Sequence, residues 1–143
     1  MCLRDMIINL KIMKELGDFI EKLFIDYVDY EYCYRARKAG YLCLMVNKYK
    51  LNHQVGGMRP IVKYGIHFRN HNEHNAIRQY YMARNAIYVI KKYPEMAMKW
   101  VKNLIKAPIK IILVDDDKVS KSKGYIEGII DGLRNHYGPK TYL

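Results

Sequence analysis

The stretch FIDYVDYEYCYRARKAGY, residues 24–41, gathers three acids, two arginines and five tyrosines in one short segment. From residue 27 to residue 39 the pattern is helical, and Gly40 suits the left-handed backbone that often follows a helix. Asp26 is predicted to cap the helix start, because its carboxylate can accept hydrogen bonds from exposed first-turn amides. The acids would then lie at the helix N-terminus, where the helix dipole favours negative charge.

The charges of this helix allow two interpretations. Glu31 and Arg35 are four residues apart and can form an ion pair, which leaves Asp29 free to point elsewhere. An unpaired carboxylate at a helix N-terminus is predicted to keep a low pKa, and it could accept a proton from a bound hydroxyl or hold a sugar. The alternative is a solvated helix end with a surface salt bridge.

The remaining chain suggests one compact unit with several short elements. Residues 7–16 predict a short amphipathic segment that stops at Gly17. Downstream we expect two short strands at residues 41–47 and 48–55, then a break at the paired glycines of residues 56–60. Three helices are expected to follow, at residues 72–93, 96–114 and 119–134. The last helix has an apolar stripe of Ile126, Ile129, Ile130 and Leu133.

Composition restricts the class of protein. A chain of 143 residues has room for one modest core, and a formal charge of +11 implies an anionic partner: nucleic acid, a phosphorylated ligand or an acidic membrane surface. The three cysteines have neither the even count nor the spacing of a disulfide framework or a zinc site, which favours a reducing cytoplasm. Neither a signal peptide pattern nor an apolar run of membrane-spanning length is visible.

Residues 96–114 carry lysines at positions 99, 102, 106 and 110, with Trp100 and several aliphatic residues between them. This spacing predicts a basic amphipathic helix. Such a helix could lie in the headgroup region of an anionic membrane, or it could pack its apolar side on the domain and expose lysines to water. The sequence leaves both possibilities open.

The run from Val28 to Tyr41, followed by HQVGG at residues 53–57, resembles the acceptor-side half of family 2 glycosyltransferases, most closely bacterial rhamnosyltransferases. HNAIRQYYMARN at residues 74–85 and IIDGLRNHYG at residues 129–138 are similar to later blocks of that branch. The resemblance therefore covers nearly the whole chain. It implies an inverting sugar transfer in bacterial cell-surface polysaccharide synthesis, from a dTDP-rhamnose-like donor to a glycan or lipid-linked glycan acceptor.

The resemblance also implies roles for individual residues. Asp29 matches the general base that deprotonates the acceptor hydroxyl, and Glu31 and Arg35 would support acceptor binding. His53 matches a histidine that can complete a metal shell; the alternative is a structural histidine near a strand end. Arg78 and Arg84 would contact diphosphate or acceptor, although a core helix with arginines reaching outward is an equal alternative.

In this family another half of comparable size binds the nucleotide and a divalent Mg or Mn ion. The start of this chain departs from that pattern, which predicts a truncated or split-gene product that binds no metal and is inactive alone. The expected fold is α/β or α+β: an incomplete A-type glycosyltransferase domain with a few strands. Residues 1–70 would be its acceptor-side part and residues 71–143 a basic helical region, peripheral at the inner face of the cell membrane.

Two other clusters of possible metal ligands are weaker. His67, His71 and His74 could share a helical face, but surface histidines without metal explain them as well. The acids at 115–117 are predicted to start the last helix rather than to hold a metal ion. The competing function is a basic module that binds a membrane or nucleic acid without catalysis, and no nucleic-acid recognition motif is legible.

Overall fold

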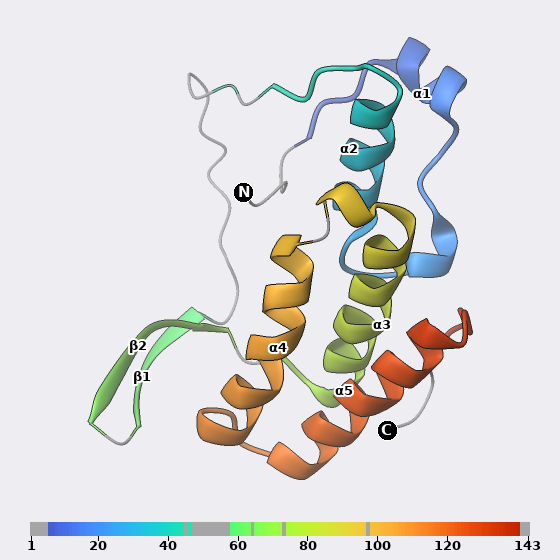
Figure 1. Ribbon diagram of the computed structural model, residues 1–143. Helices are drawn as coiled ribbons and strands as arrows, with labels where there is room; N and C mark the ends of the chain where they lie inside the picture. Colours follow the sequence, from blue (N-terminus) through green and yellow to red (C-terminus); the bar gives the residue numbers. More distant parts are fainter. Residues whose placement is uncertain are drawn as a thin grey trace.

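The computed structural model describes residues 6–44, 46, 58–63, 65–72, 74–96 and 98–140. These residues form five α-helices, two short 3-10 helices and two strands (Figure 1). In chain order the elements are α1 (Leu10–Leu16), η1 (Glu21–Leu23), α2 (Val28–Lys38), β1 (Met58–Lys63), β2 (Ile66–Asn72), α3 (Ala76–Lys92), η2 (Pro94–Met96), α4 (Met98–Leu113) and α5 (Lys118–Leu133).

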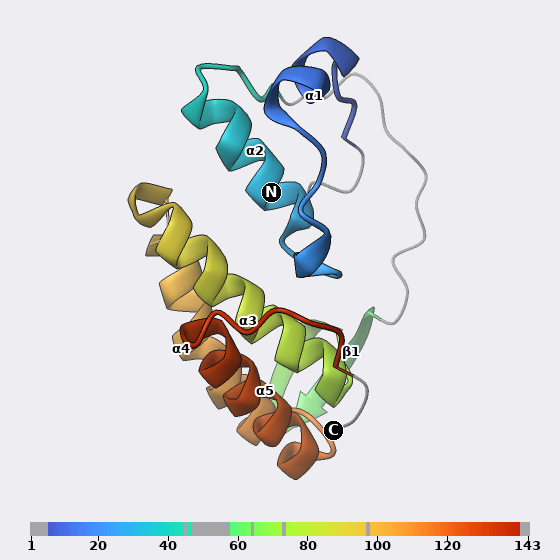
Figure 2. The same cartoon turned by 90° about the vertical axis from the view of Figure 1, so that its right-hand side faces the viewer.

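Helix α3 is the centre of the molecule. Figure 2 shows it running between α2 on one side and α5 on the other. The main core joins η1, the start of α2, the second half of α3 and the start of α4 through buried side chains: Leu23, Tyr27, Ala86, Tyr88, Val89, Tyr93 and Trp100. One core therefore draws on residues both before and after position 70.

Aromatic side chains fill much of this core. The Trp100 ring meets Tyr27 and Tyr30 edge-on, at centroid distances of 4.6 and 4.7 Å. Its indole Nε1 donates a hydrogen bond of 2.8 Å to the Tyr34 hydroxyl. These contacts tie α4 to α2, because a buried indole is stabilised when its N–H finds an acceptor.

Helix α5 packs on α3 through glycines. A Cβ added to Gly128 would lie 2.2 Å from the Tyr80 carbonyl oxygen, and one added to Gly132 would lie 2.9 Å from the Arg84 carbonyl oxygen. The expected apolar stripe is therefore not the main contact face: Ile126, Ile130 and Leu133 are exposed, at 56%, 40% and 59%. Close backbone approach, rather than aliphatic side chains, determines this interface.

The prediction of an A-type glycosyltransferase fold with a few strands is wrong. The described residues are mainly helical, and their strands form one antiparallel two-stranded hairpin beside the helices (Figure 1). Residues 41–44, expected as strand, have no regular secondary structure, and residues 48–55 lie outside the described part of the chain. Apolar and aromatic composition indicates burial in some element, but pairing partners decide whether a strand forms.

The predicted break at residues 56–60 is also wrong where the structure describes it, because residues 58–60 lie in β1. The pairing of β1 with β2 is irregular between Arg59 and Ile61, so Pro60 sits where a regular ladder hydrogen bond is not required. The helices at 72–93, 96–114 and 119–134 are confirmed with shifted ends. Gly17 and Gly40 have positive φ angles of 81° and 89°, as their places after helices predicted.

Candidate functional site

Asp29 lies in the first turn of α2 and is half-buried. Its Oδ1 accepts a hydrogen bond of 2.9 Å from the Tyr30 backbone N–H. The predicted cap is wrong, because Tyr27 rather than Asp26 occupies the N-cap position. The helix consequently begins after an unusual turn in which Asp26 and Tyr27 both have left-handed backbone, with φ angles of 60° and 67°.

The environment of Asp29 makes it a stronger base than its position predicted. Burial raises the pKa of the Asp29 carboxyl, and the negative charge of Asp26 adds to the rise, against the lowering effect of backbone hydrogen bonds. The prediction of a low pKa is therefore wrong. Desolvation outweighs the backbone hydrogen bonds that favour the carboxylate at this partly buried position.

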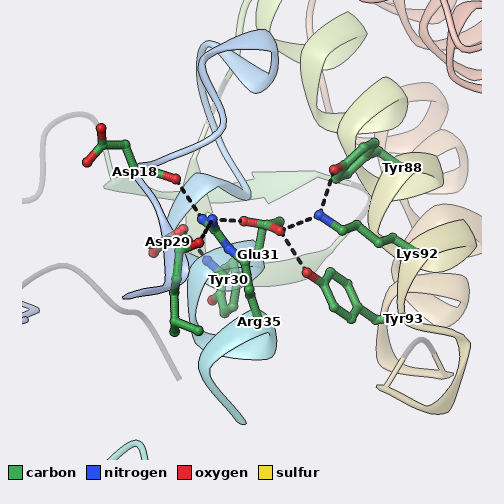
Figure 3. Close-up of polar contacts among 9 residues, drawn as sticks. Asp18, Asp29, Tyr30, Glu31, Arg35, Tyr88, Lys92 and Tyr93 are labelled. Atoms are coloured by element: carbon green, nitrogen blue, oxygen red, sulfur yellow. Dashed lines mark hydrogen bonds and ion pairs between the residues drawn. The ribbon is translucent and has the colours of Figure 1, made fainter. Parts of the chain in front are cut away.

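Glu31 is the centre of a buried network that joins α2 to the end of α3 (Figure 3). Its side chain has no exposed surface, and its Oε1 accepts hydrogen bonds of 2.8 Å from Lys92 Nζ and 2.7 Å from the Tyr93 hydroxyl. Lys92 also donates to the Tyr88 hydroxyl at 3.0 Å. Burial and the bond to Glu31 raise the pKa of Tyr93 to about 12, so its hydroxyl stays a donor at neutral pH.

Arg35 extends this network toward the segment between α1 and η1. Its Nη2 lies 3.2 Å from Glu31 Oε2, which confirms the predicted ion pair one helical turn apart. It also donates hydrogen bonds of 2.8 Å to the carbonyl oxygens of Leu16 and Asp18. Glu31 and Arg35 thus hold three segments of the chain together (Figure 3).

Three buried polar atoms of α2 retain unused hydrogen-bonding capacity. Glu31 Oε2, the Tyr32 hydroxyl and Arg35 Nε make no hydrogen bond to any residue that the structure describes. A buried polar group without a partner costs free energy, and such groups often satisfy a ligand or an ordered water. Because these atoms have almost no exposed surface, an enclosed water rather than an outside ligand is what would satisfy them.

Arg84 is completely buried in α3. Its guanidinium donates to the carbonyl oxygens of Gly138 and Lys22, each at 2.8 Å, and lies 4.7 Å from the ring centre of Tyr81. This buried placement differs from both alternatives that the sequence suggested for Arg84, a contact with diphosphate or acceptor and an arginine that reaches outward. Arg84 joins the C-terminal segment to η1 through the inside of the molecule.

Asn85, the next residue, holds the turn that leads into α2. Its Nδ2 donates to the carbonyl oxygens of Leu23, Ile25 and Asp26, at 2.8, 2.7 and 3.1 Å. Left-handed backbone at residues other than glycine is costly and persists only where its surroundings impose it. Asn85 supplies that constraint and so positions the start of α2, on which Asp29 lies.

Arg78 forms a two-point ion pair with Asp26. Its Nε and Nη2 donate to the two carboxylate oxygens at 3.0 and 2.9 Å. This hydrogen-bonded pairing raises the pKa of Arg78. The pair fixes the turn to the start of α3 and leaves Asp26 with less net charge to offer a ligand.

A cavity of about 360 Å³ opens beside this turn, between α2, α3 and α4. Its polar lining comes from Asp26, Gln79, Asn103, Lys106 and Lys110. Its apolar lining includes the aromatic rings of Tyr27, Tyr30, Trp100 and Tyr125. Rings combined with amides and charged groups suit a ligand with both apolar and polar faces, such as a sugar. Asp29 is not part of this lining.

The histidines give no metal centre in the described structure. His53 lies outside the described residues, and His67 and His71 lie on β2. His74, just before α3, has its pKa lowered by burial and by Arg78. No group of three or more His, Cys, Asp or Glu among the described residues could hold a metal ion.

Sequence reasoning did not find Lys92 or Tyr93 as parts of this site, nor the bonds of Asn85 to the turn before α2, nor the pairing of Asp26 with Arg78. The partners in these contacts are separated by 52 to 62 positions in the chain. The one usable signal was the Arg-Asn pair at positions 84 and 85 inside an otherwise apolar and aromatic helix. Buried polar residues of that kind require partners, which marks them for attention.

The comparisons with known proteins support a distant relationship to a glycosyltransferase. The chain is 28% identical over 138 residues to the dTDP-rhamnosyl transferase RfbF of Shigella flexneri. The match covers 94% of this chain and 45% of that protein, so the chain spans less than half the length of its relative. No family model and no solved structure matches the chain.

Proposed function

We propose that the chain forms the acceptor-side part of an inverting glycosyltransferase related to rhamnosyltransferases. The observation that carries this proposal is the similarity to RfbF along nearly the whole chain. By analogy with that relative, a dTDP-rhamnosyl transferase, the donor is dTDP-rhamnose or a close analogue and the acceptor is a glycan. The match spans 45% of RfbF, and the proposal places the donor site in polypeptide outside the matched segment.

Asp29 is the proposed catalytic base. In the reaction its carboxylate takes the proton of an acceptor hydroxyl, the hydroxyl oxygen bonds to the anomeric carbon, and the nucleoside diphosphate leaves. A carboxylate whose pKa is raised by burial binds that proton more strongly than a solvated one.

Glu31 and Arg35 act in this proposal mainly as positioning residues. Their bonds to α3 and to the segment before η1 hold the first turn of α2 in place, with Asn85 fixing the turn that precedes it. Arg84 contributes in the same way, because its guanidinium is occupied inside the fold. Arg78 is the more accessible of the two arginines and remains the candidate for contact with a charged ligand.

The proposal for the whole enzyme includes a divalent metal on the donor diphosphate. The described residues contain no group of three or more His, Cys, Asp or Glu that could hold this ion. The proposal also includes peripheral contact with an anionic membrane at its cytoplasmic face, where lipid-linked acceptors would be found. None of the described helices is long and apolar enough to cross a membrane.

The test is a chimera in which this chain replaces the matching segment of RfbF, assayed with dTDP-rhamnose and glycan acceptors beside the chain alone. We expect the chimera to transfer sugar and the chain alone to be inactive. Asp29→Asn should lower kcat by a factor on the order of 10² to 10⁴, the usual contribution of a general base. Asp18→Asn, an exposed carboxylate near the same helix, is the matched control.

The two parts of the proposal fail separately. A chimera that folds but transfers no sugar would contradict the assignment as a transferase segment. An active chimera that keeps full activity with Asp29→Asn would remove Asp29 as the base while leaving the class of enzyme intact. Transfer by the chain alone, at the rate of RfbF, would contradict the need for a second segment.

A further inference from the structure

Helix α4 leaves an apolar stripe uncovered. Met98, Val101, Ile105, Ile109 and Ile112 follow one another at intervals of three or four residues, so they share one face of the helix. Ile105, Ile109 and Ile112 are 62%, 54% and 56% exposed. The residues that α4 buries lie on a different face and include Trp100 and Ile111.

A row of lysines borders this stripe. Lys99, Lys102, Lys106 and Lys110 each lie one position beyond a stripe residue, which places them along one edge of it. The helix carries no acidic residue from position 98 to position 113. Lys102, Lys106 and Lys110 are exposed and form no ion pair with another described residue.

We infer that this face of α4 docks on the surface of an anionic lipid bilayer. The aliphatic side chains would enter the boundary between headgroups and acyl chains, and the lysines would contact lipid phosphates. A helix of 16 residues is too short to span a bilayer, so α4 lies along its surface.

Charge complementarity selects the bilayer over a second copy of the chain. Two copies that met through this stripe would bring their lysine rows together, and the whole chain already carries a formal charge of +11. An anionic membrane satisfies both the apolar stripe and its basic edge. This face of α4 is the surface for the membrane contact in the proposed function. The inference rests on that function only for the reason why the chain would contact a membrane.

The experiment is flotation of the full chain with two kinds of vesicle: phosphatidylcholine alone, and phosphatidylcholine mixed with phosphatidylglycerol. We expect binding to the mixed vesicles, weakened by salt, and little binding to the neutral ones. Each lysine near an anionic surface strengthens partitioning about five-fold, so Lys102→Gln with Lys106→Gln should weaken it about 25-fold. Lys11→Gln with Lys14→Gln, two exposed lysines of α1, removes the same charge as a control.

A second pair of variants tests the apolar stripe. Ile105→Ser with Ile109→Ser should weaken binding at least ten-fold. Ile7→Ser with Leu42→Ser changes two aliphatic residues that are 100% and 85% exposed outside α4, and it should leave binding unchanged. Circular dichroism checks that each variant is folded, and light scattering without lipid measures the oligomeric state.

Equal binding to neutral and anionic vesicles, or equal losses from the α1 and α4 lysine variants, would overturn the inference. So would stripe variants that dissociate an oligomer while vesicle binding stays intact, since a second copy would then occupy the stripe. The assay contains no sugar donor, so its outcome is independent of the transferase test.

Discussion

The junction of α2 with α3 and the outer face of α4 use charge in opposite ways. At the junction, Glu31 has no exposed surface and binds Lys92 and Tyr93 from a distant part of the chain. Arg84, elsewhere on α3, is equally buried and binds the Gly138 and Lys22 carbonyl oxygens. On α4, the lysines and three of the four isoleucines, Ile105, Ile109 and Ile112, are exposed. Charges at the junction hold the molecule together, whereas those of α4 remain available to a partner. Charged side chains therefore stabilise the fold in the first region and form a possible binding surface in the second.

Arg84→Met should produce the largest loss of stability. A small loss would contradict the view that buried charges hold this molecule together. The change leaves the carbonyl oxygens of Gly138 and Lys22 without their buried donor. We expect the free energy of unfolding to fall by about 4 kcal/mol, measured by urea denaturation. Arg37→Met, at an exposed position of α2, should change it by less than about 0.5 kcal/mol.

Gly128→Ala tests the glycine contact between α3 and α5. An added Cβ would meet the Tyr80 carbonyl at 2.2 Å, so the helices must separate, at a cost of about 3 kcal/mol. Alanine normally stabilises a helix relative to glycine by about 1 kcal/mol. Gly128→Ala should therefore lower the melting temperature if the helices pack through this glycine, and raise it if they do not. Gly138→Ala, where the Cβ meets nothing within 4 Å, is the control. Equal melting temperatures would contradict the packing.

Glu31→Gln should cost about 2 kcal/mol, less than a fully enclosed ion pair would. The amide can still accept from Tyr93, but it loses the charge that faces Lys92 and Arg35. The side chains of Lys92 and Arg35 are 39% and 21% exposed, so water can solvate their charges when the carboxylate is lost. Glu21→Gln, on exposed η1, should have no comparable effect in the same denaturation measurement.

Asp29→Asn should have the smallest effect on stability, and in the opposite direction. Because burial raises the pKa of this carboxyl in the folded state, ionisation opposes folding, and the wild-type chain gains stability as pH falls through that pKa. The asparagine variant should be slightly more stable near neutral pH and equal to wild type below pH of about 4, where both side chains are neutral. A variant less stable at neutral pH would show that the charge supports the fold.

Much of the helical framework was predictable from sequence, since apolar periodicity, Gly17, Gly40 and Pro94 mark helices and their ends. The β-hairpin at residues 58–72 was missed, because Pro60 disfavours a strand except where pairing is irregular. The Glu31–Arg35 pair was predictable because both residues share one helix. Its partners on α3 were not, since they are about 60 positions away.

By itself the sequence determined the helices, the basic character of the chain and the acidic start of α2, because these depend on neighbours within a few residues. Only the tertiary structure decided which charges are buried and which face outward. It placed Arg84 inside, left Ile126 and Ile130 of α5 exposed, and left Ile105, Ile109 and Ile112 of α4 uncovered. Whether a side chain is buried with a bonding partner or exposed on the surface depends on segments far apart in the chain. Residues of the same type can therefore stabilise the interior in one place and form a binding surface in another.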